Sequence, residues 1–274
     1  MSHRPAWAPD DIDLERPAPA RMYDYYLGGS HNFAADRELA EKALGAWPEL
    51  PQIARGLRAF LRRCVTFLVE QGVDQFLDLG SGIPTAGNVH EIVSALNPRA
   101  RIAYVDSDPV AVAHSKLLLK DTPNARIVHA DMRDAGAVLT DPALDGFLDL
   151  SRPTAVLMCA VLHFVPDSDD PAGVVAAYRE ATAPGSYLAV SHGTRDYLPE
   201  QIRNLQEVYS RSSAPMTFRS HAEIMDLMQG YELVPPGLVD FILWRAETPN
   251  PLPDPLGGDV TRYSGYAAVG RRDE

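Results

Sequence analysis

Cysteine and positive charge are scarce in this sequence. Its 274 residues include only two cysteines, Cys64 and Cys159, which lie far apart. Such a pair matches neither the spacing of a zinc site nor the cysteine density of a secreted disulfide scaffold. Lysine and arginine total 25 against 37 aspartates and glutamates, which gives a net charge of -12. That excess of negative charge opposes broad contact with a polyanion, so we expect no nucleic-acid partner.

Long hydrophobic runs are missing as well. The longest apolar stretch, residues 155–162, falls far short of the roughly 20 residues that cross a bilayer. Residues 1–16 contain no apolar core of a signal peptide. We therefore expect a cytoplasmic protein without a membrane partner. The sequence is nonetheless 46% apolar, which is enough for a large folded core.

The chain is predicted to divide into three parts. Residues 1–18 are rich in prolines and acidic residues and poor in apolar ones, which is typical of a flexible arm. Residues 19–72 are expected to form a helical cap. Residues 73–274 are expected to form the main domain, with a helical insertion at about 197–236.

One helix of the cap is strongly indicated. From Pro51 onward, apolar residues recur at 3.6-residue spacing until Gly72 ends the run. The arginines of this helix fall mostly on its other side, which favours a solvated face over a partner site. These residues are Arg55, Arg58, Arg62 and Arg63.

Short apolar runs alternate with helical patterns in the main domain. Continuously apolar runs are typical of strands in a parallel sheet that helices cover on both faces. The alternation therefore predicts an α/β fold with a doubly wound sheet. Strands are expected at 75–79, 101–105, 125–129, 154–159 and 187–191, and helices at 85–96, 110–120 and 171–183.

The last third of the chain follows another pattern. Helices are predicted at 199–210 and 221–229, followed by two strand-like runs at 237–244 and 263–269. A proline-rich loop, residues 246–259, separates the two runs and can close an antiparallel pair. The expected sheet thus has seven strands, mostly parallel, with an antiparallel last strand.

A glycine-rich turn follows the first predicted strand. In an open parallel sheet the ligand lies beyond the carboxyl ends of the strands, so this turn is a candidate binding site. Gly80 and Gly82 lack a Cβ atom, which lets a ligand approach the backbone closely. A dinucleotide fingerprint needs a small residue where Thr85 stands, and the lysine of a phosphate-binding P-loop is absent. The turn reads Asp78-Leu79-Gly80-Ser81-Gly82-Ile83-Pro84.

Acidic residues also end the next two predicted strands. Asp106 ends the second strand, where a carboxylate can accept hydrogen bonds from both hydroxyls of a ribose. The alternative role for Asp106 is a helix cap before Pro109. Asp131 ends the third strand and can accept from an adenine amine, while Met132 offers an apolar wall; the alternative for Asp131 is a simple turn residue.

These three features, in this order, resemble the class I S-adenosylmethionine-dependent methyltransferases. Pro84 stands where that family usually has a third glycine. The stretch 19–38 further resembles the opening of an actinobacterial S-adenosyl methyltransferase family of unassigned substrate, formerly a domain of unknown function. The usual Lys-Asp before the asparagine of that opening is Ser30-His31 here. The resemblance spans roughly residues 19–271.

The resemblance implies a Rossmann-like methyltransferase with S-adenosyl-L-methionine as cofactor and a small-molecule methyl acceptor. It places the insertion at about 197–236 on the acceptor side of the site. It implies cofactor contacts at Asp78, Gly80, Ser81, Gly82, Asp106, Ser107, Asp131, Met132 and Ala160. Asn32 joins this set if the N-terminal segment closes over the cofactor as a lid. The alternative is that the neighbouring tyrosines merely anchor that segment.

His163 is the candidate catalytic residue. Histidine is the natural general base near neutral pH, and the segment after the fourth predicted strand resembles the Leu-His-acidic loop of small-molecule O-methyltransferases. The alternative is that His163 binds a loop carbonyl and only shapes the site. His192 is interpreted as a buried histidine with satisfied hydrogen bonds. No metal is predicted, because the aspartates at 167–170 lack the spacing of a calcium loop.

Two rival functions remain open. A cofactor-binding sensor or scaffold without transfer activity would keep the glycine turn and Asp106. A nicotinamide-dependent oxidoreductase shares the sheet and the ribose acid, but Thr85 and the antiparallel ending argue against it.

Overall fold

The structure is a computed structural model that describes residues 13–84, 87–246, 256 and 258–273. It contains an eight-stranded sheet in the order β3-β2-β1-β4-β5-β8-β6, with β7 also paired to β8. The first five strands pair in parallel, and β8 runs antiparallel to β5. The strands are β1 Gln75–Leu79, β2 Arg101–Asp106, β3 Ala125–His129, β4 Ala155–Cys159, β5 Tyr187–Gly193, β6 Glu232–Leu233, β7 Val239–Asp240 and β8 Gly265–Arg271. The predicted doubly wound, mostly parallel α/β sheet is confirmed.

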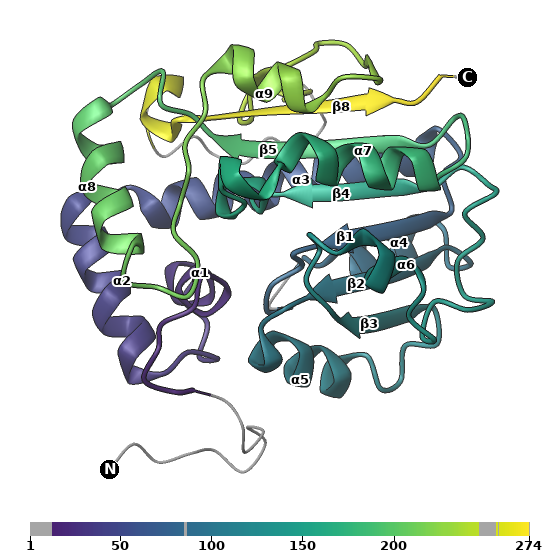
Figure 1. The fold of residues 1–274 in the computed structure, drawn as a ribbon, viewed down its shortest axis with the longest axis horizontal. Coiled ribbons are helices and arrows are strands. Elements are labelled where there is room, and N and C mark those ends of the chain that lie inside the picture. The colour runs from purple at the N-terminus through teal and green to yellow at the C-terminus, as the bar shows by residue number, and fades with distance from the viewer. Residues whose placement is uncertain (1–12, 85–86, 247–255, 257, 274) are drawn as a thin grey trace.

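Helices cover both faces of the sheet and one end of it (Figure 1). They are α1 Pro19–Tyr26, α2 Ala34–Ala46, α3 Leu50–Glu70, α4 Val89–Leu96, α5 Pro109–Leu118, α6 Ala135–Leu139, α7 Pro171–Ala181, α8 Pro199–Tyr209 and α9 His221–Leu227. Short 3-10 turns occur at Leu162–Phe164, Asp167–Asp169 and Val260–Tyr263. No helix among these described residues is long and apolar enough to span a membrane.

The strand predicted at 237–244 is wrong in most of its length. Only Val239–Asp240 is a strand, and tight turns follow it. The guanidinium of Arg63 donates hydrogen bonds to the carbonyl oxygens of Phe241 at 2.7 Å and Trp244 at 2.6 Å. These hydrogen bonds hold the turn against α3, and within this run only Val239 and Asp240 pair with β8 as a strand. The apolar run instead buries Phe241 and Trp244 beneath α3, which explains its strand-like composition.

Other predicted boundaries shift by a few residues. The run at 263–269 becomes β8, Gly265–Arg271, because Tyr263 still belongs to a 3-10 turn. The helix predicted from residue 85 is seen from Val89, after an Asn88 capping box, while residues 85–86 lie outside the described part. A short strand that was not predicted, β6 at Glu232–Leu233, precedes the predicted run, and Pro235 and Pro236 separate it from β7, since proline has no N–H to donate to a ladder.

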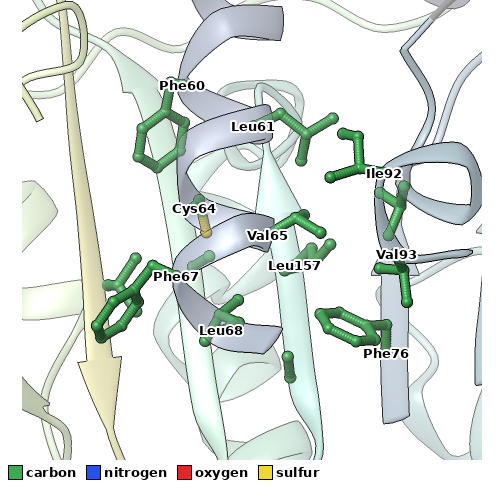
Figure 2. Close-up of a cluster of buried hydrophobic side chains, with 14 of the residues drawn as sticks. Phe60, Leu61, Cys64, Val65, Phe67, Leu68, Phe76, Ile92, Val93 and Leu157 are labelled. Carbon is green, nitrogen blue, oxygen red and sulfur yellow. The ribbon is translucent and has the colours of Figure 1, made fainter. Parts of the chain in front are cut away.

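The core of the main domain is built largely on α3. Figure 2 shows Phe60, Cys64, Phe67 and Leu68 of this helix facing the sheet, with Phe76 of β1 among the residues they approach. These five side chains are at most 6% exposed. The strands alternate between this layer and a second cluster on the other face, so that both faces of the sheet are buried. The second half of α3 is thus part of the sheet domain, not of the cap that we predicted at 19–72.

The cap consists of α1, α2 and α8, which lie together beyond the carboxyl ends of the parallel strands (Figure 1). The predicted insertion at 197–236 is therefore divided, because α8 packs on α2 while α9 packs on α7. The predicted flexible arm is also divided. Residues 13–18 contact the body, where the carbonyl oxygen of Pro17 accepts from the Ser213 N–H at 2.8 Å. Residues 1–12 lie outside the described part.

Candidate functional site

A cavity of about 550 Å³ lies at the carboxyl ends of the parallel strands, between the sheet and the cap. The turns that follow β1, β2, β3 and β4, together with the carboxyl end of β5, contribute to its walls, as expected for an open parallel sheet. Residues from α1, α3 and α8, together with Trp47 just after α2 and the segment 213–218, supply much of the remaining wall. The predicted residues that line it are Asp78, Gly80, Ser81, Gly82, Asp106, Ser107, Asp131, Met132, Ala160 and His163.

The glycine turn packs tightly at Gly80 and leaves open space for a ligand at Gly82. Gly80 and Gly82 have φ angles of +68° and +67°, in the left-handed region that favours glycine. A Cβ atom on Gly80 would come within 2.2 Å of Val161 Cγ2, whereas a Cβ on Gly82 would meet nothing within 4 Å. The Ser81 hydroxyl is buried and has no hydrogen-bond partner within the described chain. The turn thus offers an unused polar group beside a backbone that a ligand can approach.

Asp106 joins the turns after β1 and β2. Its Oδ2 accepts from the Gly82 N–H at 2.7 Å, and its Oδ1 accepts from the Asp108 N–H at 2.8 Å. A carboxylate has about four lone-pair positions, so that each oxygen can still accept from a ligand. Burial raises the pKa of Asp106 to about 6, and the two backbone N–H groups offset part of that shift. The helix cap is provided by Asp108, which accepts from the Val110 N–H, so the capping role considered for Asp106 falls to its neighbour.

Asp78 is a second buried carboxyl in the same cavity. It is 7% exposed, and burial raises its pKa to about 7. The nearby Arg58 guanidinium lowers the pKa, while the Asp106 carboxylate raises it. Burial thus favours the protonated form of Asp78 relative to an exposed aspartate.

Sequence reasoning missed Arg58. It lines the cavity and donates to the Asn88 Oδ1 at 3.0 Å, so the solvated-face interpretation is wrong for this residue. Arg63 is also turned inward, onto the carbonyls described above. The helical spacing contained the signal, because the first half of α3 faces the cavity with a stripe at i, i+3, i+4 and i+7. The stripe consists of Leu50, Ile53, Ala54, Leu57, Arg58 and Leu61.

Asp131 and Met132 lie in the turn after β3 and line the cavity. Asp131 is paired with Arg133 at 2.5 Å, and hydrogen bonds from this arginine lower its pKa. A ligand amine there would share the carboxylate with Arg133. Met132 is 6% exposed, and its carbonyl oxygen accepts from the Tyr178 hydroxyl at 2.8 Å, which fixes the backbone of this turn.

Asn32 is not brought to the cavity. Its Nδ2 donates to Asp24 Oδ2 at 2.8 Å and to the Gly29 carbonyl oxygen at 3.0 Å. Its Oδ1 accepts from Arg37 at 3.1 Å. The side chain therefore holds the loop between α1 and α2, and it is not among the residues that line the cavity. The segment that does reach the cavity from this end of the chain is 13–26.

Ala160 and His163 form the wall after β4. Ala160 has a φ of +56°, and its N–H donates to the carbonyl and hydroxyl oxygens of Ser191 at 3.0 and 2.9 Å. His163 is 7% exposed, and burial lowers its pKa well below the usual value, as do His192 and Arg219. Its Nδ1 is buried and has no hydrogen-bond partner among the described residues. His163 is thus a neutral imidazole, and the loop carbonyl considered as its partner is not bonded to that nitrogen.

His192 has both ring nitrogens in use. Its Nε2 lies 2.8 Å from Arg219 Nη1, and its Nδ1 lies 2.7 Å from the Gly193 carbonyl oxygen. Arginine can only donate, so Nε2 is the acceptor and Nδ1 carries the proton. Arg219 also donates to Asp167 Oδ1 at 2.6 Å. His192 is therefore neutral and fully bonded, in agreement with the interpretation from sequence.

Comparison with known proteins shows which family the chain resembles. A family described as S-adenosyl methyltransferase matches residues 5–273. A crystal structure of a candidate methyltransferase from Thermobifida fusca YX is 38% identical, with a TM-score of 0.90 over 98% of this chain and all of its own. A DUF574 family protein from Streptomyces avermitilis MA-4680 is also 38% identical, with a TM-score of 0.89 over 95% of this chain and 99% of its own. No curated protein matches the sequence.

Proposed function

The chain belongs to the S-adenosyl methyltransferase family, and from that premise we propose that it transfers the methyl group of S-adenosylmethionine to a small molecule by in-line displacement. The observation that carries the proposal is the meeting of the glycine turn with Asp106 in one cavity. Gly80, Gly82 and Asp106 are held together by the Gly82 N–H bond to the Asp106 carboxylate.

The residues present fit S-adenosylmethionine. The turn leaves room for a ligand at Gly82, and the buried Ser81 hydroxyl has no partner within the described chain. Asp106 would hold the ribose hydroxyls, because each oxygen has a lone pair left. Asp131 and Met132 would contact the adenine, and Asp78 the methionine end. When bound, the cofactor supplies an electrophilic methyl group on a positively charged sulfur.

The protein's task in such a displacement is mainly to position the acceptor and exclude water. The cap closes the cavity opposite the strand ends, and its walls are largely apolar. His163 would receive the acceptor's proton, since its imidazole is neutral. Its lowered pKa makes it a weak base, so it assists most when the acceptor proton is acidic.

Replacing Asp106 with alanine is expected to weaken binding of S-adenosylhomocysteine by about 1.5 to 3 kcal/mol, the scale of lost charge-assisted hydrogen bonds. Isothermal titration calorimetry measures this directly. Asp108→Asn is the matched control, because it removes one charge from the same turn and keeps a side chain that can cap α5. Equal affinities for the native protein and a folded Asp106→Ala variant would contradict the ribose contact.

Transfer itself needs a separate experiment. The native protein, incubated with methyl-labelled S-adenosylmethionine and fractionated cell extract, is expected to label a small molecule. Binding of the cofactor with no labelled product in any extract would favour the sensor or scaffold.

A further inference from the structure

The cavity has an apolar side that the cofactor contacts proposed above do not use. We call it the acceptor wall and define it as Tyr26, Trp47, Phe164, Tyr209, Met216 and Phe218, all of which line the cavity. These side chains belong to one cluster that joins α1, α2 and α8. The ring centroids of Phe164 and Tyr209 are 6.0 Å apart, and that of His163 lies 4.5 Å from that of Phe164. Flat aromatic rings and a flexible thioether favour a planar, apolar ligand.

Among the described residues, the acceptor wall contains one hydroxyl hydrogen without an acceptor. The hydroxyl oxygens of Tyr26 and Tyr209 lie 3.1 Å apart, and these residues are 6% and 5% exposed. Burial raises the pKa of both, so that both hydroxyls keep their protons. One hydroxyl donates to the other, and the hydrogen of the accepting hydroxyl is left over. Because buried donors are rarely left unpaired, this hydrogen indicates an acceptor atom on the ligand.

Charge around the acceptor wall disfavours a cation. The carboxylates that line the cavity belong to Asp13, Asp78, Asp106, Asp108 and Asp131, none of which is in the acceptor wall. Behind His163 and His192 lies Arg219, 4% exposed, whose guanidinium holds the Nε2 of His192. Its Asp167 partner has a side chain that is 79% exposed and therefore well solvated. A protonated amine here would meet no carboxylate among the described residues of the acceptor wall, whereas an oxygen that gains negative charge would be favoured by the buried guanidinium behind His192.

We propose that the methyl acceptor is an aromatic hydroxyl compound with a second oxygen, stacked on the acceptor wall with that oxygen bonded to the Tyr26 and Tyr209 pair. This inference rests on the proposed methyl transfer and names its substrate class. The aryl oxygen forms the new bond to the methyl carbon as its proton passes to His163 and then to solvent. The bonding pair of the broken C–S bond stays on sulfur. The products are an aryl methyl ether, S-adenosylhomocysteine and one proton.

Binding of probe compounds to the protein saturated with S-adenosylhomocysteine tests the proposed substrate class without turnover. The probes share one ring system: 2,3-dihydroxynaphthalene, 2-naphthol, which lacks the second oxygen, and 2-naphthylmethylamine, which is a cation at pH 7. Titration calorimetry is expected to show the diol binding at least tenfold more tightly than the amine. Comparable binding of the amine, or no binding of the diol at millimolar concentration, would overturn the inference.

The double variant Tyr26→Phe/Tyr209→Phe tests the hydrogen bond. It removes both hydroxyls together and keeps both rings, a change that leaves no buried group unpaired. Affinity for the diol is expected to fall about three- to tenfold, the range for one neutral hydrogen bond, while affinity for 2-naphthol changes less than twofold. Each single variant keeps one hydroxyl and is expected to lose less. An unchanged ratio of diol to 2-naphthol affinity in the double variant would overturn the assigned contact.

Binding of S-adenosylhomocysteine is the control that distinguishes failure of the proposed methyl transfer from failure of the proposed substrate class. S-adenosylhomocysteine should bind the native protein and the double variant equally, which also shows that the variant folds. If it binds neither, the proposed function fails and the inference fails with it. If it binds both while the amine is preferred, only the substrate class is wrong.

Discussion

Replacing Gly80 with alanine is expected to lower the free energy of unfolding by about 3 to 5 kcal/mol, the sum of a left-handed backbone and an overpacked contact. The new Cβ would lie 2.2 Å from Cγ2 and 2.8 Å from Cβ of Val161. Valine is stiff at χ1, and its backbone follows Ala160, which already has a φ of +56°. Neither the Val161 side chain nor its backbone can move away without a further cost in free energy. Denaturant unfolding of the free protein measures the loss.

Gly82→Ala is the matched control for this change. Its φ of +67° is nearly that of Gly80, but no atom lies within 4 Å of the added Cβ. Only the backbone strain remains, so the loss should be about 1 to 2 kcal/mol. Adding Val161→Ala to Gly80→Ala removes the nearer contact and should restore part of the difference. Equal losses at the two glycines would show that Val161 does not limit this turn.

Asp78→Asn is expected to change how stability depends on pH. The pKa of Asp78 is raised to about 7 in the folded protein by burial, against about 3.9 in an unfolded chain. Between these values the folded state holds a proton that the unfolded state has lost, so this group makes stability fall as pH rises from about 4 to 7. Asparagine does not titrate. Relative to the native protein, Asp78→Asn should therefore gain about 3 to 4 kcal/mol between pH 4 and pH 8.

Denaturant unfolding of both proteins at several pH values measures this difference. Asp74→Asn is a useful control, because Asp74 is paired with Arg152 at the surface, near the other end of β1. It should give a nearly constant difference from the native protein. A constant difference for Asp78→Asn as well would mean that Asp78 is ionised throughout this range.

The alternating part of the fold was predictable from sequence because its strands are buried on both faces. The runs at 75–79 and 125–129 coincide with β1 and β3, and the run at 187–191 lies within β5. The pattern failed over most of 237–244, where only Val239–Asp240 is a strand and burial under α3 explains the apolar composition of the rest. Hydropathy indicates that a segment is buried but does not distinguish a strand from a buried turn. In the structure, the hydrogen bonds from Arg63 to the carbonyl oxygens of Phe241 and Trp244 belong to a turn.

The candidate site was predictable where its residues are consecutive and not where the cap supplies them. The turns at 78–82 and 106–107 follow strands whose carboxyl ends meet at one edge, so their proximity follows from the topology. The position of Arg58, the pairing of Tyr26 with Tyr209 and the location of Asn32 depend on how α1, α2 and α8 pack. Tyr26 and Tyr209 are 183 positions apart, and no local pattern connects them.

The cap draws its helices from two distant parts of the sequence, and the sheet turns belong to neither. Substitutions in α1, α2 or α8 can thus reshape one half of the cavity while the Gly80 turn and Asp106 stay intact. Because the two halves of the cavity come from separate parts of the chain, related proteins can change the molecule that they modify while the residues that bind the methyl donor stay the same.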